Sequence, residues 1–565
     1  MPVVNVRLNN LQRTFPNISL DELIDKIPYL GLDIESFGES QDTLKLEFNP
    51  NRPDFASENG IIRALKGILN VELGIPYVKK VHDSPEYIYV DKNLETIRPI
   101  IYGLTAKRIE PLSNVELSQL ISIQEDLHNG LGRKRKKSSI GIHNYDALTF
   151  PLHFNAATKD KKFVPLDAKL EMSMRQILEE SQIGKKYGHL LLESDFVPLL
   201  EDSCGNVVSF PPIINGTTSI VDSTTRNLFV EVTATNFKSA KEMLALLSYE
   251  LADMGFDLFN ITIHSPFEGD VVTPNLDPII IDADVDKINN ILGLDLRPEK
   301  IIECLRKSRC DGLLTEKGKV RCIAPSYRID LFDINDVIEE VAIGYGINNL
   351  KPDHPNTYFD GKKNTRSLVF EKIRETLVGL GFIEILNPNI ISKKALEQTL
   401  IFDDELSERL ILLGDSQNAE YEVLRISLIP SMIGTLSLNI HERYPQKLFE
   451  IGKIFREDGN SIYEGWSLSV SIAHDSTDYT EIKSNLVSLM KYCFDKSIST
   501  PRVQTPYLLD GHSAEIVLDA NIIGFIGELH PQVLENYNMR TLVSLFEIDL
   551  SKTMDLLNLN KDDVF

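Results

Sequence analysis

The sequence has no cysteine pattern that would predict a disulfide framework or a zinc site. Its five cysteines are irregularly spaced, none of them forms Cys-x-x-Cys, and no histidine lies beside them at the spacing of zinc ligands. The amino terminus also lacks a basic segment followed by an apolar one, and no apolar run is long enough to cross a bilayer. These absences favour free thiols in a reducing cytosol, and therefore a cytoplasmic protein that has no membrane partner.

Positive charge is scarce relative to negative charge. The 565 residues include 59 Lys and Arg against 83 Asp and Glu, which gives a net charge of -24. This balance argues against a protein that grips nucleic acid over its whole surface, although it is compatible with a local basic patch. With 42% hydrophobic and 25% charged residues, the composition is that of a soluble globular protein, and the length predicts about four domains.

An acidic segment at 328–346 is the most informative part of the chain. From Asp333 onward its apolar residues recur at helical spacing, Asp333 is placed as an N-cap, and Asp336 stands where a capping box has its acid. Three carboxylates share one helix face and a fourth precedes the helix: Asp336, Glu339, Glu340 and Asp330. Two interpretations are open. The acids complement the helix dipole, or they form a hard-cation site, because converging carboxylates repel each other unless a cation neutralises them.

The same segment resembles a known motif. Arg-x-Asp followed by Asp-x-x-Glu-Glu-Val and Gly-Tyr-Gly is similar to the magnesium-binding segment of the phenylalanyl-tRNA synthetase beta subunit. The resemblance implies Mg2+ at the contact with an alpha subunit, held partly through water, and its residues would be Asp330, Asp336, Glu339 and Glu340. The phrase Asn-Arg-Pro-Asp at 51–54 resembles the N-terminal domain of the same family; a turn before a core helix over 57–69 is the alternative.

The only dense basic run of the chain lies between a glycine and a predicted strand. It consists of Arg133, Lys134, Arg135, Lys136 and Lys137. Such a loop can contact the phosphates of tRNA or the acidic surface of a partner, and a solvated loop is the alternative. The continuation Ile-Gly-Ile-His-Asn-Tyr-Asp at 140–146 resembles the archaeal and eukaryotic form of the family. A lone histidine such as His143 is more often structural than catalytic.

Two further segments resemble the family's editing domain. They are residues 211–219 and residues 227–235, and the second alternates like a strand. An apolar pocket built for phenylalanine cannot strongly reject tyrosine, which merely adds a hydroxyl, so a second, hydrolytic site is one solution. The resemblance implies an editing cavity between the two segments; a solvent-facing Glu231 is the alternative. The implied editing residues are Asn215, Gly216, Thr217, Glu231 and Thr233.

The C-terminal part resembles the first two signature motifs of class II aminoacyl-tRNA synthetases. An amphipathic helix is expected over 367–380, and the strand expected over 447–456 ends at Arg456, which matches the arginine that grips ATP. The third motif is missing, because the glycine-rich segment 523–531 has no arginine to pair with the triphosphate. The resemblance therefore implies an inert relative without catalytic residues for aminoacylation, with ATP and phenylalanine bound in the alpha subunit.

These features predict an α+β multidomain fold that ends in a class II-like antiparallel sheet with flanking helices. The predicted domains are an N-terminal α/β domain at 1–76, an editing-type domain at 77–265, a magnesium-site domain at 267–350 and an inert class II-like domain at 356–565. The implied function is that of a phenylalanine--tRNA ligase beta subunit of archaeal or eukaryotic type, an ATP-dependent ligase of protein biosynthesis in a complex of two alpha and two beta chains that edits tyrosyl-tRNA. A non-enzymatic tRNA-binding or scaffold protein and a free-standing hydrolase of mischarged tRNA are the alternatives.

Overall fold

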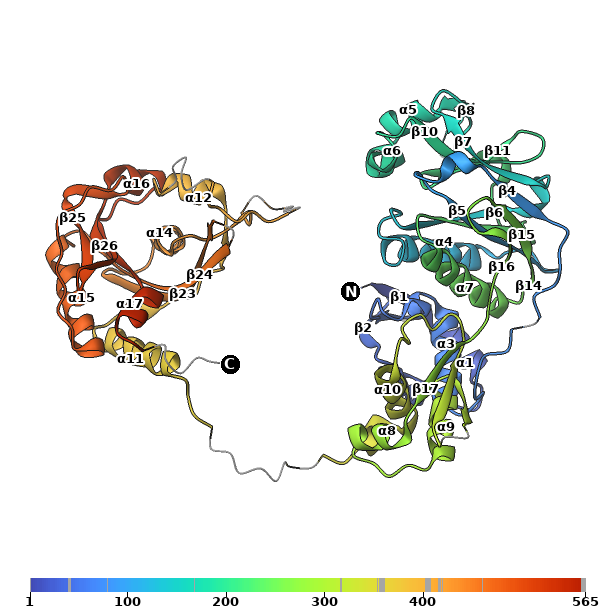
Figure 1. Ribbon diagram of the computed structural model, residues 1–565, viewed down its shortest axis with the longest axis horizontal. Coiled ribbons are helices and arrows are strands. Elements are labelled where there is room, and N and C mark those ends of the chain that lie inside the picture. Colours follow the sequence, from blue (N-terminus) through green and yellow to red (C-terminus); the bar gives the residue numbers. More distant parts are fainter. Residues whose placement is uncertain are drawn as a thin grey trace. The chain divides into compact units, whose positions relative to one another are not determined.

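The computed structural model describes residues 2–559 except 39–41, 79, 167, 316–317, 353, 355–360, 402–407, 415–417, 419 and 460. Contacts divide the chain into two compact units, 1–354 and 355–565, and each unit has its own sheets and helices (Figure 1). Both units mix helices and strands, which confirms the predicted α+β class. The boundaries of the four predicted domains stay a prediction.

The first unit begins with a small sheet packed against helices. Its three antiparallel strands have the order β1 (Val3–Arg7), β3 (Thr43–Glu47), β2 (Asp33–Phe37), and its helices are α1 (Leu8–Thr14), α2 (Leu20–Lys26) and α3 (Glu58–Ile68). The side chain of Ser57 accepts a hydrogen bond from Gly60 N and so caps α3, which is the helix predicted over 57–69. Apolar residues of the sheet and the three helices form one core.

Two sheets make up the middle of the first unit. One has the antiparallel order β14 (Asp257–Phe259), β5 (Ile100–Lys107), β13 (Asn227–Ala234), β6 (Ser138–Asn144). The other has the order β12 (Ile214–Asn215), β11 (Val207–Phe210), β10 (Phe196–Glu201), β7 (Leu152–Thr158), β4 (Tyr87–Val90), β15 (Ile261–Ser265), β16 (Gly269–Thr273). Helices α4 (Asn114–Asn129) and α7 (Phe237–Asp253) cover the four-stranded sheet (Figure 1). One apolar core joins these helices to both sheets, so the predicted strand over 227–235 is an interior strand.

A second pair of helices, shorter than α4 and α7, packs against the face of the seven-stranded sheet that lies opposite the core described above. They are α5 (Met174–Glu180) and α6 (Gln182–Tyr187), and they share an apolar core with β10 and β11. The short strand β12 comes after β11 in the chain, pairs with it, and leads into a helical turn at Thr217–Ser219. The segment 211–219 therefore runs along the edge of this layer.

The last sheet of the first unit supports the acidic helix. Its antiparallel order is β17 (Ile279–Ala283), β19 (Val320–Ala324), β18 (Asp311–Leu314), and its helices are α8 (Val285–Leu292), α9 (Pro298–Lys307) and α10 (Ile334–Tyr345). The predicted cap at Asp333 and its capping box with Asp336 are confirmed. The sequence of 325–330 predicts a strand that runs into the acidic helix, and this prediction is wrong. The segment turns, because Arg328 N donates to Pro325 O and the Arg328 side chain points into the interior.

The second unit is built on one sheet of six strands. The order is β20 (Ile383–Glu384), β23 (Gln446–Asp458), β24 (Ser461–Ala473), β27 (Val543–Asp549), β26 (Asn521–Leu529), β25 (Leu508–Leu518), and among these β20 and β23 are parallel. Helices α11 (Thr365–Gly379), α15 (Tyr479–Phe494) and α17 (Leu550–Leu556) share one apolar core with the sheet. Helices α14 (Ile429–Leu438) and α16 (Pro531–Asn536) share a second core. The helix predicted over 367–380 and the strand predicted over 447–456 are confirmed as α11 and β23.

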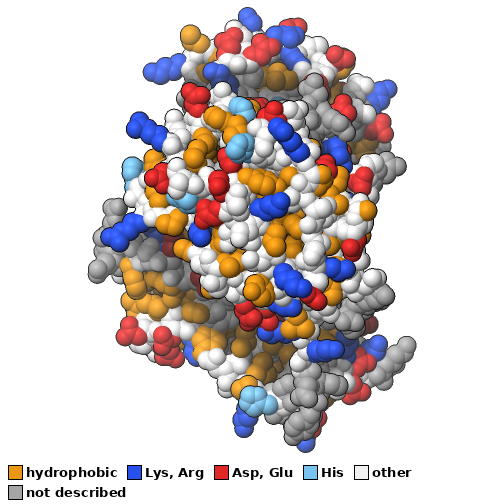
Figure 2. Space-filling view, turned by 90° about the vertical axis from the view of Figure 1, so that its left-hand side faces the viewer, with side chains coloured by type: hydrophobic (Ala, Val, Ile, Leu, Met, Phe, Trp, Pro, Cys, Tyr) orange, Lys and Arg blue, Asp and Glu red, His pale blue; other side chains and the backbone are white. Residues whose placement is uncertain are grey.

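Charged side chains of both signs are interspersed on the surface. On the face that Figure 2 shows, acidic side chains lie among basic and apolar ones and do not form one continuous acidic area. Of the helices in the described part of the chain, none is both long enough and apolar enough to pass through a bilayer.

Candidate functional site

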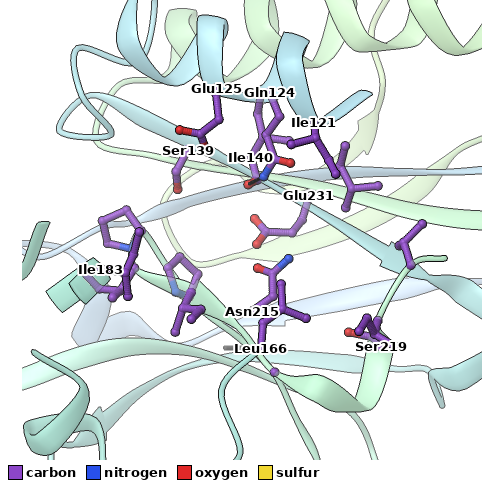
Figure 3. Close-up of a pocket in the computed structure, with 18 of the residues that line it drawn as sticks. Ile121, Gln124, Glu125, Ser139, Ile140, Leu166, Ile183, Asn215, Ser219 and Glu231 are labelled. Atoms are coloured by element: carbon purple, nitrogen blue, oxygen red, sulfur yellow. Dashed lines mark hydrogen bonds between the residues drawn. The ribbon is translucent and has the colours of Figure 1, made fainter. Parts of the chain in front are cut away.

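A pocket of about 280 Å³ opens between α4, the sheet strands β6 and β13, and the segment that follows β11. Most of its wall is aliphatic, and a few polar groups face into it (Figure 3). Its lining includes Ile121 and Gln124 of α4, Ile140 of β6, Asn215 of β12, Ser219 and Glu231. An apolar cavity with a small number of placed polar groups is the usual form of a small-molecule site.

Glu231 is the most unusual polar residue of the pocket. It lies at the middle of β13, paired with Gly103 of β5 on one side and Gly141 of β6 on the other, and only 2% of it is exposed. The alternative of a solvent-facing Glu231 is therefore wrong. Its Oε1 accepts a hydrogen bond from Ser209 Oγ at 3.0 Å, while its Oε2 has no partner in the described structure. A buried carboxylate oxygen without a donor is costly, and it is therefore available to a ligand that brings one.

His143 lies beside Glu231, which the sequence pattern did not reveal. Its Nδ1 is 2.8 Å from Ser219 Oγ, and its Nε2 lies 3.9 Å from Glu231 Oε1 without a hydrogen-bond partner among the described residues. Ser219, His143 and Glu231 come from segments up to 88 positions apart, so only their pairing within the fold brings them together. The imidazole is completely buried and does not line the pocket. It therefore approaches the carboxylate from behind the pocket wall.

The five residues predicted for editing divide into two groups. Asn215, Gly216 and Glu231 line the pocket. Thr217 Oγ1 donates to Val164 O at 3.2 Å, and Thr217 is not part of the lining. Thr233 lies behind the wall and is fully buried.

Thr233 belongs to a buried polar cluster that supports the pocket wall. Its Oγ1 accepts a hydrogen bond from Arg98 Nε at 2.8 Å and lies 3.0 Å from Oγ of Ser139, which does line the pocket. Burial lowers the pKa of the Arg98 guanidinium to about 9, and the charge of Glu231 opposes that shift. Thr233 is thus connected to the pocket wall by its contact with Ser139.

The basic run also divides into one residue that lines the pocket and others that face outward. Arg133, Lys134 and Arg135 have φ angles of 48°, 53° and 66°. Three successive residues therefore adopt the left-handed conformation, which is unfavourable for residues other than glycine. Arg135 turns inward to the pocket, where it donates to Ile213 O at 2.9 Å and to Glu125 Oε1 at 2.7 Å. Hydrogen bonding to His128, followed by the charge of Arg135, lowers the pKa of Glu125 to about 2.

The remaining residues of the run face outward. Arg133, Lys134 and Lys136 are exposed, and Lys137 is half-buried. The strained turn therefore separates one arginine that closes the pocket wall from a group of cations at the surface beside it. The prediction that these cations contact tRNA or a partner concerns the outward group.

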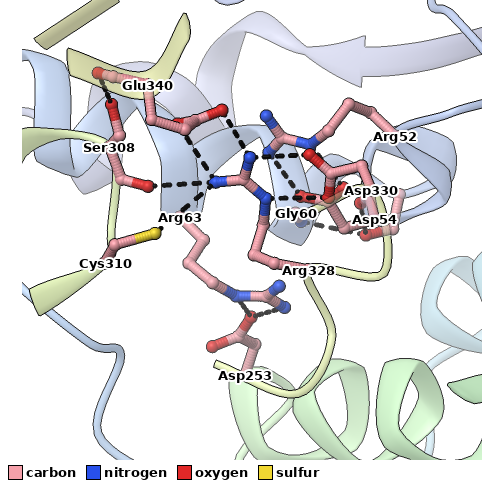
Figure 4. Close-up of polar contacts among 11 residues, drawn as sticks. Arg52, Asp54, Gly60, Arg63, Asp253, Ser308, Cys310, Arg328, Asp330 and Glu340 are labelled. Atoms are coloured by element: carbon pink, nitrogen blue, oxygen red, sulfur yellow. Dashed lines mark hydrogen bonds and ion pairs between the residues drawn. The ribbon is translucent and has the colours of Figure 1, made fainter. Parts of the chain in front are cut away.

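The acidic segment contains its own cation. Arg328, which is 1% exposed, donates from Nε and Nη2 to both oxygens of Asp330 at 3.0 and 2.7 Å, and its Nη1 donates to Glu340 Oε2 at 3.2 Å (Figure 4). Asp336 Oδ2 accepts from Phe332 N at 2.6 Å as part of the helix cap. Two of the four predicted metal residues thus pair with an arginine, and a third caps α10.

Glu339 is the fourth predicted metal residue and is exposed. Burial, followed by the charges of Glu340, Asp330 and Asp336, raises its pKa. In the part of the chain that the structure describes, no three His, Cys, Asp or Glu side chains converge closely enough to hold a metal ion. Among the four predicted metal residues, Glu339 and one oxygen of Asp336 have no hydrogen bond or ion pair with the residues that the structure describes.

The second unit contains a buried ion pair at strand β23 of its sheet. Arg425 Nη1 lies 2.6 Å from Glu450 Oε1, and the two side chains are 1% and 0% exposed. A Cβ at Gly452 would lie 2.2 Å from Arg425 Nη2. Arg456, the position that matches the ATP-gripping arginine, stacks its guanidinium 4.1 Å from the ring centre of Tyr463.

Comparison with known families gives the class of protein to which these features belong. Residues 281–347, which contain α10, match the tRNA synthetase B5 domain. Residues 347–550 match the phenylalanyl tRNA synthetase beta chain CLM domain. The two matches place the chain among the tRNA synthetases.

Similarity over the whole chain is more specific. The chain is 35% identical to the phenylalanine--tRNA ligase beta subunit of Archaeoglobus fulgidus over 98% of this chain and 99% of that protein, and 33% identical to that of Methanocaldococcus jannaschii over 97% and 100%. A crystal structure of an N-terminal fragment of the Pyrococcus horikoshii phenylalanyl-tRNA synthetase beta-subunit covers 61% of this chain with a TM-score of 0.58 and 32% identity. The chain belongs to the family of phenylalanine--tRNA ligase beta subunits.

Proposed function

We propose that this chain is the beta subunit of a phenylalanine--tRNA ligase, which attaches phenylalanine to its tRNA at the expense of ATP. Membership of the family over 98% of the chain supports this function. Its partner would be an alpha subunit, in a complex of two alpha and two beta chains that works in the cytoplasm. The alpha subunit would bind ATP and phenylalanine, and this chain would supply scaffold, editing and part of the interface.

The predicted four-domain organisation is part of the proposal. Apolar cores within 1–76, 267–350 and 356–565 support it, and the core of the middle part lies mainly within 77–265, with Tyr327 packed into it. We assign the last of these a class II-like sheet that does not catalyse aminoacylation. The buried pair of Arg425 and Glu450 supports an inert face, because an internal ion pair already occupies the charged groups that would otherwise meet a nucleotide.

We also propose that the pocket beside Glu231 hydrolyses tyrosyl-tRNA. The observation that carries this proposal is the buried, unpartnered Glu231 Oε2 in an otherwise largely aliphatic cavity. The phenol of a tyrosyl group would donate the missing hydrogen bond, whereas a phenylalanyl group would leave the carboxylate unpaired. A site built in this way favours the mischarged product over the correct one. Ser209 and His143 would position the carboxylate from behind.

Replacement of Glu231 by glutamine or alanine tests the editing proposal. In the assembled enzyme, Glu231→Gln and Glu231→Ala should slow tyrosyl-tRNA hydrolysis by about tenfold or more, because one hydrogen bond to a charged acceptor is lost. Phenylalanylation should be unchanged. Glu179→Gln, an exposed glutamate on α5, is the matched control. Hydrolysis at the wild-type rate in both Glu231 variants would place the editing site elsewhere.

Magnesium at the start of α10 completes the proposal. The predicted group is Asp330, Asp336, Glu339 and Glu340. Burial raises the pKa of Glu339, and the charges of the other three carboxylates raise it further, which supports a bound cation beside it. Glu339 and the free Asp336 oxygen would hold the ion, in part through water, since magnesium retains several waters. The ion would neutralise acids that repel an incoming alpha subunit, and its role would be structural.

A further inference from the structure

The guanidinium of Arg328 lies at the centre of the carboxylate cluster that precedes and opens α10. Both oxygens of Asp330 accept hydrogen bonds from it, at 3.0 and 2.7 Å. Both oxygens of Glu340 accept as well, Oε2 from Nη1 at 3.2 Å and Oε1 from Nη2. All four carboxylate oxygens are therefore engaged by one arginine (Figure 4).

The surroundings bury this guanidinium and both of its carboxylate partners almost completely. The Arg328 and Glu340 side chains are 1% and 5% exposed, and Asp330 is 10% exposed. Arg328 Nη1 also donates to Ser308 O at 3.3 Å, which fixes the guanidinium to the end of α9. A magnesium ion takes oxygen ligands at about 2.0–2.1 Å, so at these oxygens it would lie directly against the guanidinium, a charge of the same sign.

A second arginine-carboxylate pair reinforces the cluster from the N-terminal part of the chain. Arg52 donates to both oxygens of Asp54, at 2.9 and 2.8 Å. Figure 4 shows this pair beside Arg328 and Asp330. The two Arg-x-Asp segments thus bring together two cations and three carboxylates, counting Glu340, so the buried charge is almost balanced without a metal.

We propose that Arg328 is the resident cation of this cluster, and that Asp330 and Glu340 are its ion-pair partners and not ligands of a divalent metal. The bidentate fork of the guanidinium replaces the ion at the two buried carboxylates and ties the middle of α10, at Glu340, to the end of α9, at Ser308. This narrows the proposed magnesium site to Asp336 and Glu339. It stands on the geometry of this chain alone and does not depend on the proposed editing activity.

Hydrogen exchange of the α10 amides in the full-length chain, in magnesium chloride and in EDTA, tests the proposal. In wild-type protein the amides of the buried α10 residues Ile338, Glu340 and Val341 should be protected equally in both solutions. Arg328→Lys keeps the charge but loses the fork, so exchange in α10 should accelerate about tenfold or more. Arg321→Lys is the matched control, because Arg321 forms an exposed pair with Asp282 in the same part of the chain.

Two further variants keep the test decisive if Arg328→Lys folds poorly. Arg328→Gln leaves two buried carboxylates unpaired, and the triple variant R328Q/D330N/E340Q should recover protection relative to it because no unpaired buried charge remains. A magnesium effect confined to the amides next to Asp336 and Glu339, and retained in Asp330→Asn, agrees with an ion at those two residues. The proposal is overturned if magnesium protects wild-type α10 and Asp330→Asn abolishes that protection, or if Arg328→Lys exchanges like the wild type.

Discussion

At the scale of single residues, the pocket depends on a position that has no side chain. Gly141 pairs with Glu231 across β6 and β13, and a Cβ there would lie 2.5 Å from Glu231 Oε1 and 2.6 Å from His143 Nε2. We expect Gly141→Ala to lower the free energy of unfolding by about 1–3 kcal/mol, because the methyl displaces two buried polar groups. It should also slow tyrosyl-tRNA hydrolysis. Urea unfolding and a deacylation assay measure the two effects.

Gly434→Ala is the control for that substitution. Gly434 lies within α14, and a Cβ there would meet nothing within 4 Å, so the change should stabilise the helix by up to about 1 kcal/mol. A Gly141→Ala protein that unfolds and hydrolyses like the wild type would show that the space between Glu231 and His143 has no role.

Several residues have surroundings that the sequence alone does not show. The strand pattern around Glu231 is compatible with a solvent-facing side chain. Alternation of polar and apolar residues does not show that β13 lies between two other strands or that its faces are buried. Within the basic run, nothing distinguishes Arg135 from the cations next to it until the left-handed turn directs it inward. The motif identified Asp330 and Glu340 correctly as neighbours, but it did not show that Arg328 lies between them.

At the scale of elements, the start of α4 positions one wall of the pocket. Ser113 and Glu116 form a capping box, and Arg108 Nη1 donates to Glu116 Oε1 at 2.8 Å. That hydrogen bond, against the effect of burial, lowers the pKa of Glu116 from 4.5 to about 2. Because the pKa is lower in the folded state, the stability that Glu116 contributes is present above pH 4.5 and is lost as the pH falls towards 2.

Glu116→Gln should therefore have a pH-dependent effect. At pH 7 we expect it to lower the free energy of unfolding by about 1–2 kcal/mol, the value of a helix cap with a charged partner. Urea unfolding at a series of pH values should show the difference from wild type shrinking below pH 4.5. A difference that stays constant with pH would mean that the ionised carboxylate is not the stabilising form.

The left-handed turn makes a separate prediction about RNA. Replacement of Arg133, Lys134 and Lys136 by serine removes the outward cations and leaves Arg135 in the pocket wall. The slope of log K for tRNA against log salt should flatten by about 2–3 if all three neutralise phosphates. Fluorescence anisotropy with the assembled enzyme measures the slope. A triple replacement of the exposed Lys92, Lys241 and Lys287 by serine is the control, and an equal effect of both would indicate general electrostatics only.

Elements with strong local signals were predictable, and elements set by tertiary contacts were not. The helix α10 follows from Asp333, Asp336 and apolar residues at helical spacing, and the alternation of 447–456 gives β23. The segment 325–330 contains residues suited to a strand, yet it turns because the buried Arg328 must reach both Asp330 and Glu340. A long-range polar contact outweighs local propensity there.

At the scale of the whole molecule, the second unit decides whether this chain can activate an amino acid alone. Its sheet has the buried pair of Arg425 and Glu450 on one face, and Arg456 lies against Tyr463. Glu547 accepts hydrogen bonds from Ser427 and Ser467, and burial raises its pKa. Each of these charged groups therefore contacts a neighbouring side chain of the second unit.

We expect the purified chain alone to show no phenylalanine-dependent exchange of pyrophosphate into ATP. Addition of the alpha subunit should restore exchange, because the nucleotide and phenylalanine would bind in that partner. Arg456→Ala should then leave the exchange rate of the assembled enzyme unchanged, since its guanidinium stacks on Tyr463 and meets no nucleotide. Exchange by the chain alone, abolished by Arg456→Ala, would show that the sheet of the second unit is a working active site.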